Sequence, residues 1–258
     1  MIGIIGGSGF YSLADNLKEI KVSTPYGPPS EKIALGKIGG RKIAFLPRHA
    51  KTHDFPPHKI NYRANIWALH SLGVGHIITI TAAGSLQKKY KPGSFIVIDQ
   101  FVDRTWGRAD TFYDGPVVTH VSSAFPYCPQ INKLVYSCGE KLNLRIFMGG
   151  TVVVIQGPRF STAAESAWFT KMGWDVVNMT QYPEVILAKD LGIGYTAVAL
   201  VTDFDAGLVG QEPVSAASVA RIFTKSIQKA KKLILETVKN WPKNLTCSCS
   251  KSLNGARI

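Results

Sequence analysis

The chain has 258 residues, of which 45% are hydrophobic and 18% are charged, and this composition indicates a well-packed globular protein. Its formal net charge is +13, but the basic residues are spread along the chain without a recognisable nucleic-acid-binding motif. The sequence has no apolar run of the roughly 18 residues that cross a bilayer and no signal peptide, so it predicts a cytoplasmic protein without membrane or nucleic-acid partners.

Strand-like runs and helix-like segments alternate along the first half of the chain. GIIGG opens it, and two further runs, IALGKI and RKIAFLP, flank Gly39-Gly40, a pair typical of a two-residue hairpin turn. A helix is expected from about Tyr62 to Leu72, followed by the buried strand HIITITAAG. The strand FIVIDQFV and the helix PQINKLVYSCGEKL come next.

The second half continues this alternation more regularly. It predicts the strand TVVVIQG, the helix TAAESAWFTKMG, the strand WDVVNM, the helix PEVILAKDLG and the strand YTAVALVTDFD. A long final helix is expected from about Ser215 to Asn240, because apolar residues recur there at helical spacing opposite a lysine-bearing face. The polar segment after Trp241 is expected to be loosely held.

The alternation predicts a single-domain α/β protein. Continuous apolar strands between helices indicate a largely parallel sheet covered on both faces, and the early hairpin adds an antiparallel part. We therefore expect three α-β-α layers around a central mixed sheet. The domain is expected to span residues 1–240, with residues 241–258 as a C-terminal tail that contains the motif CSC.

Four cysteines, Cys128, Cys138, Cys247 and Cys249, leave two interpretations open. The pair at 247 and 249 has no second pair at zinc-binding spacing, so the sequence predicts no metal site. In an ordinary cytosol all four would be free thiols. In the cytosol of a hyperthermophile, a strained Cys247–Cys249 disulfide is the alternative.

Polar residues follow several predicted strands at their carboxyl ends, where open α/β sheets bind ligands. The glycine loop GGSG offers backbone N–H groups and a serine hydroxyl, and Arg48-His49 adds a fixed cation and a second donor. Taken singly, each is also typical of an ordinary strand end, but together they indicate an anion. The predicted phosphate site, which uses no metal ion, consists of Ser8, Arg48, His49, Ala82 and Thr180, and the family resemblance described below adds Thr81.

Two acids, Asp203 and Asp205, stand one residue apart at the end of the last predicted strand. Solvated turns are rich in aspartate, which is the structural alternative. The apolar run ALV before the acids and the Ala-Gly pair after them favour a buried, functional position instead. Burial and a neighbouring carboxylate both raise the pKa of an aspartate above its usual value of about 3.9, so one acid can remain protonated.

With these loops in view, the sequence resembles the 5′-methylthioadenosine phosphorylases, within the trimeric purine nucleoside phosphorylase superfamily. The most specific motifs are NYRANIWAL and NMTQYPEVILAK, and the resemblance extends to about residue 240. It implies a nucleoside phosphorylase fold and the phosphorolysis of methylthioadenosine to adenine and methylthioribose-1-phosphate. Inorganic phosphate would be the co-substrate, and no cofactor is implied.

The resemblance also implies roles for individual residues in binding the nucleoside. Met179 lies under the ribose, while Phe160 and Ser161 line the purine. Asp203 and Asp205 face the purine N7 and its 6-amino group, with Asp203 as the general acid and Asp205 as its partner. Relatives that act on 6-oxopurines carry glutamate and asparagine where Ser161 and Asp203 stand, so this chain is expected to prefer a 6-aminopurine.

Three further features bear on assembly and specificity. His120 matches a residue that such enzymes lend to a neighbouring subunit, so the resemblance implies a homo-oligomer, either a trimer or a hexamer of two trimers. The CSC tail resembles that of disulfide-bearing archaeal members. The chain departs from the family at Gln181-Tyr182, at Ala216 and in its tail. Of the properties that the resemblance implies, specificity for the 5′ substituent is therefore the one that the sequence constrains least.

The sequence leaves three alternative functions. A broader purine nucleoside phosphorylase would also accept adenosine, inosine and guanosine. A hydrolytic nucleosidase would have little use for the phosphate-binding set. A nucleic-acid-binding module would explain the positive charge but not the residues at the strand ends.

Overall fold

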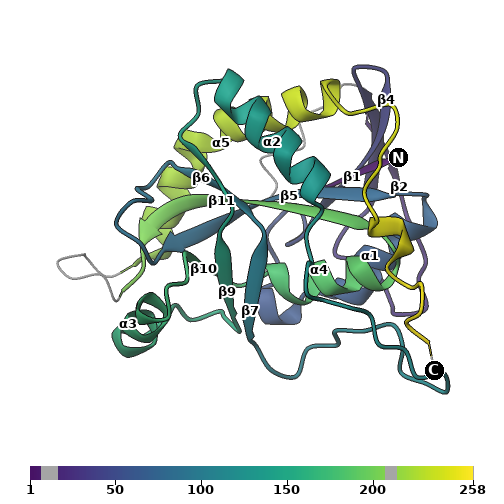
Figure 1. The fold of residues 1–258 in the computed structure, drawn as a ribbon, viewed down its shortest axis with the longest axis horizontal. Helices are drawn as coiled ribbons and strands as arrows, with labels where there is room; N and C mark the ends of the chain where they lie inside the picture. Colours follow the sequence, from purple (N-terminus) through teal and green to yellow (C-terminus); the bar gives the residue numbers. More distant parts are fainter. Residues whose placement is uncertain (7–16, 207–213, 258) are drawn as a thin grey trace.

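A mixed β-sheet runs through the middle of the molecule, with helices packed on both of its faces (Figure 1). The structure, a computed structural model, describes residues 1–6, 17–206 and 214–257. The predicted three-layer α/β architecture is therefore confirmed.

The helices lie on the two faces in pairs. α2 (Pro129–Lys141) and α5 (Ala216–Lys239) cover one face, and α1 (Tyr62–Ser71) and α4 (Gln181–Asp190) cover the other (Figure 1). α3 (Ala163–Lys171) packs at one end of the sheet and begins with a capping box. The expected helices are thus present, although α4 begins two residues earlier than predicted.

Eleven strands make up the described sheet: β1 (Ile2–Gly6), β2 (Lys18–Ile20), β3 (Ile33–Ile38), β4 (Arg41–Pro47), β5 (His76–Ser85), β6 (Phe95–Ile98), β7 (Gln100–Arg104), β8 (Ile146–Met148), β9 (Thr151–Ile155), β10 (Val176–Asn178) and β11 (Gly194–Phe204). β1 lies between β4 and β5 and is parallel to both, and β11 runs parallel to β5. β3 and β4 form the predicted hairpin, and Gly39 and Gly40 have the positive φ angles, 56° and 79°, that its turn requires.

The predicted strand FIVIDQFV is two strands with different partners. β6 pairs antiparallel with β11, whereas β7 pairs parallel with β9. The break falls at Asp99, whose side chain accepts a hydrogen bond from the Gly150 N–H (3.1 Å). The polar residue in an apolar run thus ends one pairing and begins another. The short strands β2 and β8 were not predicted.

Both faces of the central strands are buried, which explains their continuous apolar runs. Along β5, Ile77 belongs to the core beneath α1 and α4, while the next residue, Ile78, belongs to the core beneath α2 and α5. Successive strand side chains point to opposite faces, so a strand with helices on both sides needs apolar residues throughout.

The C-terminal tail packs against the domain, so the expectation of a loose tail is wrong. Trp241 is buried, and the backbone N–H groups of Thr246 and Cys247 donate to the Gln130 side chain. Farther along, the Ser252 hydroxyl donates to a backbone carbonyl of α4. Composition alone gave no sign of these contacts. All four cysteines are free thiols, so the disulfide implied by the resemblance is not formed.

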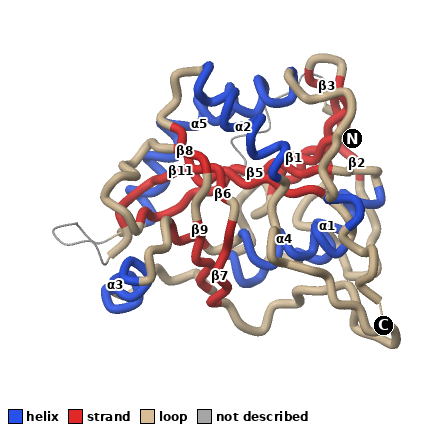
Figure 2. Tube along the Cα trace, in the orientation of Figure 1, coloured by secondary structure: helices blue, strands red, loops and turns tan. Residues whose placement is uncertain are grey.

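The segment between β7 and α2 is long and largely without regular structure. It runs along one edge of the molecule toward the C-terminus (Figure 2). There the His120 N–H donates to the Ala256 carbonyl oxygen (2.7 Å), and Thr119 bridges to Arg257. This segment and the tail therefore hold each other in place.

Candidate active site

A cavity of about 680 Å³ opens where the sheet divides beside β5. On one side of β5, β1 pairs as far as Thr79, and β10 joins only at Gly84 and Ser85. Within the described part of the chain no strand registers on that side with residues 80–83, and all four of these residues line the cavity. The open strand edge leaves backbone N–H groups unpaired, and the predicted phosphate site uses such a group at Ala82.

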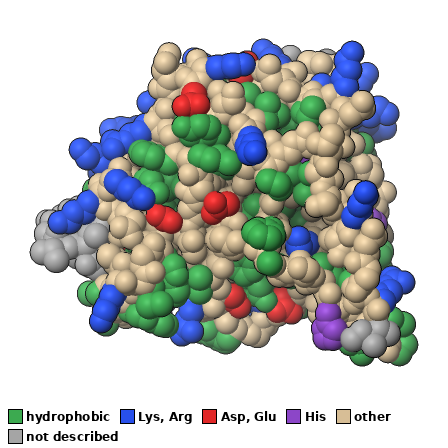
Figure 3. Space-filling model, viewed as in Figure 1, with side chains coloured by type: hydrophobic (Ala, Val, Ile, Leu, Met, Phe, Trp, Pro, Cys, Tyr) green, Lys and Arg blue, Asp and Glu red, His purple; other side chains and the backbone are tan. Residues whose placement is uncertain are grey.

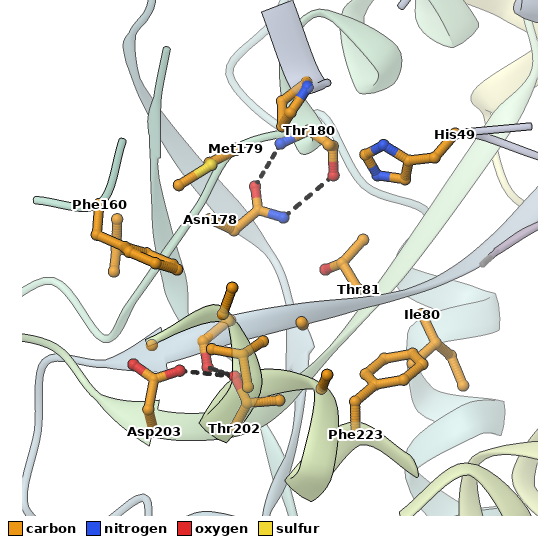
Figure 4. A pocket seen from close by; sticks show the side chains of 18 of the residues that line it. His49, Ile80, Thr81, Phe160, Asn178, Met179, Thr180, Thr202, Asp203 and Phe223 are labelled. Atoms are coloured by element: carbon orange, nitrogen blue, oxygen red, sulfur yellow. Dashed lines mark hydrogen bonds between the residues drawn. The ribbon is translucent and has the colours of Figure 1, made fainter. Parts of the chain in front are cut away.

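Most of the predicted site residues come together in this cavity. Figure 4 shows His49, Thr81 and Thr180 at one end, with Asp203 and Phe160 at the other and Met179 between the two ends. The predicted residues that line it are Arg48, His49, Thr81, Ala82, Phe160, Ser161, Met179, Thr180, Asp203 and Asp205.

Two predicted residues are not in this group. Ser8 lies outside the described residues. His120 is exposed on the segment between β7 and α2 and does not line the cavity of its own chain. Its role at a neighbouring subunit's site stays a prediction.

Arg48 is not the free cation that the sequence suggested. Its guanidinium forms a buried two-point ion pair with Glu184, from Nε to Oε2 (2.8 Å) and from Nη2 to Oε1 (2.7 Å). Tyr195 donates its hydroxyl to the same carboxylate, and Nη2 also donates to the Thr79 hydroxyl. Burial is the largest single influence and works against the charged guanidinium, but the charge and hydrogen bonds of Glu184, with smaller contributions from Tyr195 and Tyr62, together outweigh burial and raise the pKa of Arg48. Because the pair is neutral as a whole, Arg48 can offer an anion N–H groups but no excess charge.

His49 is neutral at neutral pH. Its Nδ1 lies 2.8 Å from the Phe55 carbonyl oxygen, which can only accept, so Nδ1 carries the ring proton and Nε2 is left as an acceptor. Burial, and then the charge of Arg48, lowers the pKa of His49 to about 4. His49 therefore presents an acceptor rather than the second donor expected from the sequence. Such an acceptor suits the O–H group of a protonated phosphate.

The lowered pKa of His49 makes stability depend on pH. The unfolded chain takes up this proton below about pH 6.5, whereas the folded chain resists protonation down to about pH 4. Without phosphate, we expect the wild type to lose stability relative to His49→Asn as the pH falls from 6.5 to 4, and no divergence above 6.5. Thermal unfolding of both proteins across this range is the measurement. Parallel pH profiles would contradict the assignment of a neutral imidazole.

Thr180 is the N-cap of α4, and its amide is already engaged. The Asn178 side-chain oxygen accepts from the N–H groups of Thr180 (3.0 Å) and Gln181 (3.1 Å), while the Asn178 amide donates to the Thr180 hydroxyl oxygen (3.3 Å) (Figure 4). The hydroxyl proton of Thr180 remains available for the cavity. Asn178 thus positions the hydroxyl group of Thr180. The sequence predicted Thr180 as a site residue but not the role of Asn178.

The acid pair lies at the opposite end of the cavity. The Thr202 hydroxyl donates to Asp203 Oδ2 (2.7 Å). Burial is the main cause that raises the pKa of Asp203; the Thr202 hydrogen bond opposes it, and the charge of Asp205 adds to it. Burial also raises the pKa of Asp205. Both carboxyl groups are thus biased toward holding a proton.

Asp205 Oδ2 and Ser161 Oγ are buried without a well-formed hydrogen bond among the described residues, but they lie close to each other, and the hydroxyl groups of Ser166 and Ser161 partly offset the effect of burial on the pKa of Asp205. Both residues line the cavity, with exposed fractions of 2% and 8%. Buried polar atoms are nearly always hydrogen-bonded, so these two side chains can pair with each other or with a ligand in the cavity. A flat ligand with a polar edge that donates and accepts hydrogen bonds would fit.

A bulge and a glycine set the position of the acid pair. β11 shifts register between Val201 and Asp203, which brings Asp203 opposite Gly84. A Cβ atom on Gly84 would lie 2.9 Å from Asp203 Oδ1 and 3.4 Å from Asp205 Cβ. Any larger residue at position 84 would displace the acids, so Gly84 belongs to the site although the sequence did not single it out.

The remaining wall of the cavity comes largely from α5 and is mostly apolar, with Thr224 and Lys231 as its polar members. Ile80 and Phe223 face each other there (Figure 4), and Ala216, one of the departures from the family pattern, also lines this wall. Gln181 and Tyr182 do not line the cavity. Instead, Gln181 is fully buried and accepts a hydrogen bond from the Tyr127 hydroxyl.

The fold and the cavity define an α/β enzyme that binds a small ligand at the carboxyl ends of its strands. A family model described as the phosphorylase superfamily matches residues 1–239, and the chain belongs to that family.

Individual relatives extend this result. The chain is 48% identical to the S-methyl-5′-thioadenosine phosphorylase of Thermofilum pendens, covering 100% of this chain and 98% of the relative. It is 45% identical to the purine nucleoside phosphorylase of Streptomyces coelicolor, with coverage of 98% and 94%. Among solved structures, it is similar to the methylthioadenosine phosphorylase of Schistosoma mansoni in complex with adenine, with a TM-score of 0.92, 36% identity and coverage of 99% and 98%.

Proposed function

We propose that this protein catalyses the phosphorolysis of 5′-methylthioadenosine to adenine and 5-methylthioribose-1-phosphate. The observation that carries the proposal is the arrangement of the cavity, with hydrogen-bond donors for an anion at one end and two aspartates whose pKa values are raised by burial at the other. The named relatives support the same reaction. Inorganic phosphate is the co-substrate, and the reaction needs no cofactor.

The two ends of the cavity act on opposite sides of the bond that breaks. Cleavage of an N-glycosidic bond places positive charge on the ribose and negative charge on the departing purine. Phosphate, held by the hydroxyl and N–H groups near Thr81 and Thr180, stabilises the ribose cation and then bonds to C1′. Asp203 donates a proton to purine N7, and Asp205 accepts a hydrogen bond from the 6-amino group.

The apolar wall along α5 supports an apolar 5′ substituent such as methylthio over a 5′-hydroxyl group, because an unpartnered hydroxyl is unfavourable there. The test is the rate of base release from methylthioadenosine, adenosine and inosine in the presence of phosphate. We expect kcat/KM to be highest for methylthioadenosine and lowest for inosine. Similar values for all three would favour the broader purine nucleoside phosphorylase, to which one relative points.

On the face shown in Figure 3, several lysine and arginine side chains lie near the left edge, and the others are scattered among apolar and acidic groups. The nucleic-acid-binding alternative is disfavoured because it leaves the residues that line the cavity without a role. Within the described ranges, no helix combines the length and apolar character that crossing a membrane would require. The proposed place of action is the cytoplasm.

The active protein is a homo-oligomer, a trimer or a pair of trimers, in which His120 serves a neighbouring site. The segment that carries His120 also exposes large apolar side chains, among them Trp106 (65% exposed) and Phe125 (80% exposed). Exposed apolar groups of this size are typical of surfaces covered by another protein. A second copy of the chain is the proposed cover.

Mixing two inactive variants tests this cross-subunit role. Asp203→Ala and His120→Ala subunits, dissociated and reassembled together, should regain part of the wild-type activity, because some sites then combine an intact Asp203 with a neighbour's intact His120. Each variant taken alone through the same procedure is the control. If no activity returns although subunit exchange is demonstrated, His120 does not act in trans.

A further inference from the structure

A second cluster of reactive side chains lies away from the cavity, where the C-terminal tail meets the sheet. It consists of His76, Cys128, Cys247 and Cys249, and their potential ligand atoms all lie within 4.8 Å of one another. His76 Nε2 and Cys247 Sγ are already 3.2 Å apart. Three thiols and one imidazole form a ligand set typical of structural zinc sites.

We propose that these four residues bind a zinc ion in a closed, four-coordinate site that fastens the tail to the domain. Zinc bonds of about 2.3 Å to sulfur and 2.0 Å to nitrogen place tetrahedral ligand atoms about 3.5–3.8 Å from one another. The observed cluster therefore needs to contract by about 1 Å at most, which small side-chain rotations supply. With all four positions taken by protein, no position is open to substrate.

The domain half of the site is held in a fixed place. His76 is the first residue of β5, and Cys128 precedes α2, with its N–H donating to the Tyr195 carbonyl oxygen (2.8 Å). The imidazole of His76 packs edge-on against Trp241. A Cβ atom on Gly194 would lie 2.2 Å from His76 Cδ2 and 2.4 Å from Nε2, so glycine is needed there to leave room for the ring.

The tail half is brought to the same place by its own hydrogen bonds. The Gln130 side-chain oxygen accepts from the N–H groups of Thr246 (2.9 Å) and Cys247 (3.1 Å). Past the second cysteine, the backbone of Ser250 crosses close over Gly192. Two ligands thus come from the domain and two from the tail, so a bound ion links the tail to the sheet.

The position of the cluster separates it from catalysis. His76 is at the amino end of β5, whereas the cavity is lined by the carboxyl half of the same strand. The expected effect of the ion is therefore on stability. By holding the tail, it also supports the contact between Ala256 and the N–H of His120.

Binding requires no oxidant. The three thiols become thiolates, their protons pass to solvent, His76 binds as the neutral imidazole, and the ion keeps its charge of 2+. Disulfide formation is the competing chemistry for the same sulfur atoms and needs an electron acceptor. The two outcomes differ in metal content and in the number of free thiols.

The test is the zinc content of the full-length protein, purified from zinc-supplemented medium without chelator. We expect about one zinc per chain in the wild type and almost none in Cys247→Ala/Cys249→Ala. The matched control is Cys138→Ala, which removes a buried cysteine of α2 that is not part of the cluster and should keep its zinc. A strong chelator should lower the Tm of the wild type and of Cys138→Ala.

If the double variant does not fold, a measurement on the wild type alone tests whether the cluster binds a metal ion. Cobalt(II) added to the metal-free, reduced protein should give the intense thiolate-to-cobalt absorption of a tetrahedral site, at one equivalent per chain. The proposal is overturned if the wild type binds neither metal, if its cysteines are found paired as disulfides in the metal-free protein as purified, or if Cys247→Ala/Cys249→Ala keeps the full zinc content.

Discussion

Asp203→Asn is expected to lower kcat on methylthioadenosine by about 10²- to 10⁴-fold, the usual contribution of general acid catalysis. The substitution keeps the shape of the side chain and its hydrogen bond from Thr202 but removes the proton that reaches purine N7. The raised pKa of Asp203 also predicts the pH profile. Because the acid must be protonated, kcat/KM of the wild type should fall as the pH rises through that pKa, and Asp203→Asn should lack this limb.

A second buried acid provides the control. Asp190 is 3% exposed, and burial also raises its pKa, but it binds Thr111 and the Phe112 N–H outside the cavity. Asp190→Asn should leave kcat nearly unchanged. Similar losses of kcat in both variants would mean that Asp203, like Asp190, contributes to the stability of the fold and not to proton transfer.

Substrate preference should change together with the acid. In Asp203→Asn, inosine turnover should fall much less than methylthioadenosine turnover, because the amide suits a 6-oxopurine. Adding Ser161→Glu, which can read N1–H of a 6-oxopurine, should help inosine more in this background than in the wild type, and a double-mutant cycle measures the coupling. Equal losses on both nucleosides without coupling would make Asp203 a structural turn residue.

Arg48→Ala is expected to weaken both phosphate binding and the stability of the protein. It should raise the KM for phosphate and lower kcat/KM by roughly 10²-fold or more, because the guanidinium N–H groups that contact phosphate are lost. It should also lower the free energy of unfolding by about 3–5 kcal/mol, because Glu184 is left buried without its partner. Steady-state kinetics with phosphate varied, and denaturant unfolding, measure the two effects.

The double variant Arg48→Ala/Glu184→Gln separates the two effects. Neutralising Glu184 removes the buried charge, so most of the lost stability should return. Phosphate binding should not return, because no N–H group replaces the guanidinium. An unchanged phosphate KM in the folded double variant would remove Arg48 from the phosphate site.

The sequence located the cavity because its lining residues follow strands, and parallel strands end at one edge of a sheet. It could not show how those residues are already engaged. Glu184 neutralises Arg48 from a helix 136 positions away in the chain, and Asn178 takes up the amide of Thr180. Such pairings depend on the packing of α4 against the sheet, although an acid within the apolar motif PEVILAK was an available signal.

Residue spacing does not reveal the cluster at the C-terminal tail. A zinc motif in a sequence typically shows two close pairs of ligands, whereas this cluster combines His76 and Cys128 from separate elements with Cys247 and Cys249 from the tail. Only the three-dimensional structure brings these segments together. Gly84 and Gly194 were overlooked for the same reason, because their importance lies in the side chains that pass over them.

The most direct test of the proposed reaction is the fate of the sugar. Purified protein is incubated with methylthioadenosine, with and without inorganic phosphate, and adenine is followed by absorbance and phosphate by ³¹P NMR. The account predicts adenine release only with phosphate, together with one equivalent of a sugar-1-phosphate ester. Adenine release at the same rate without phosphate, yielding free methylthioribose, would contradict it.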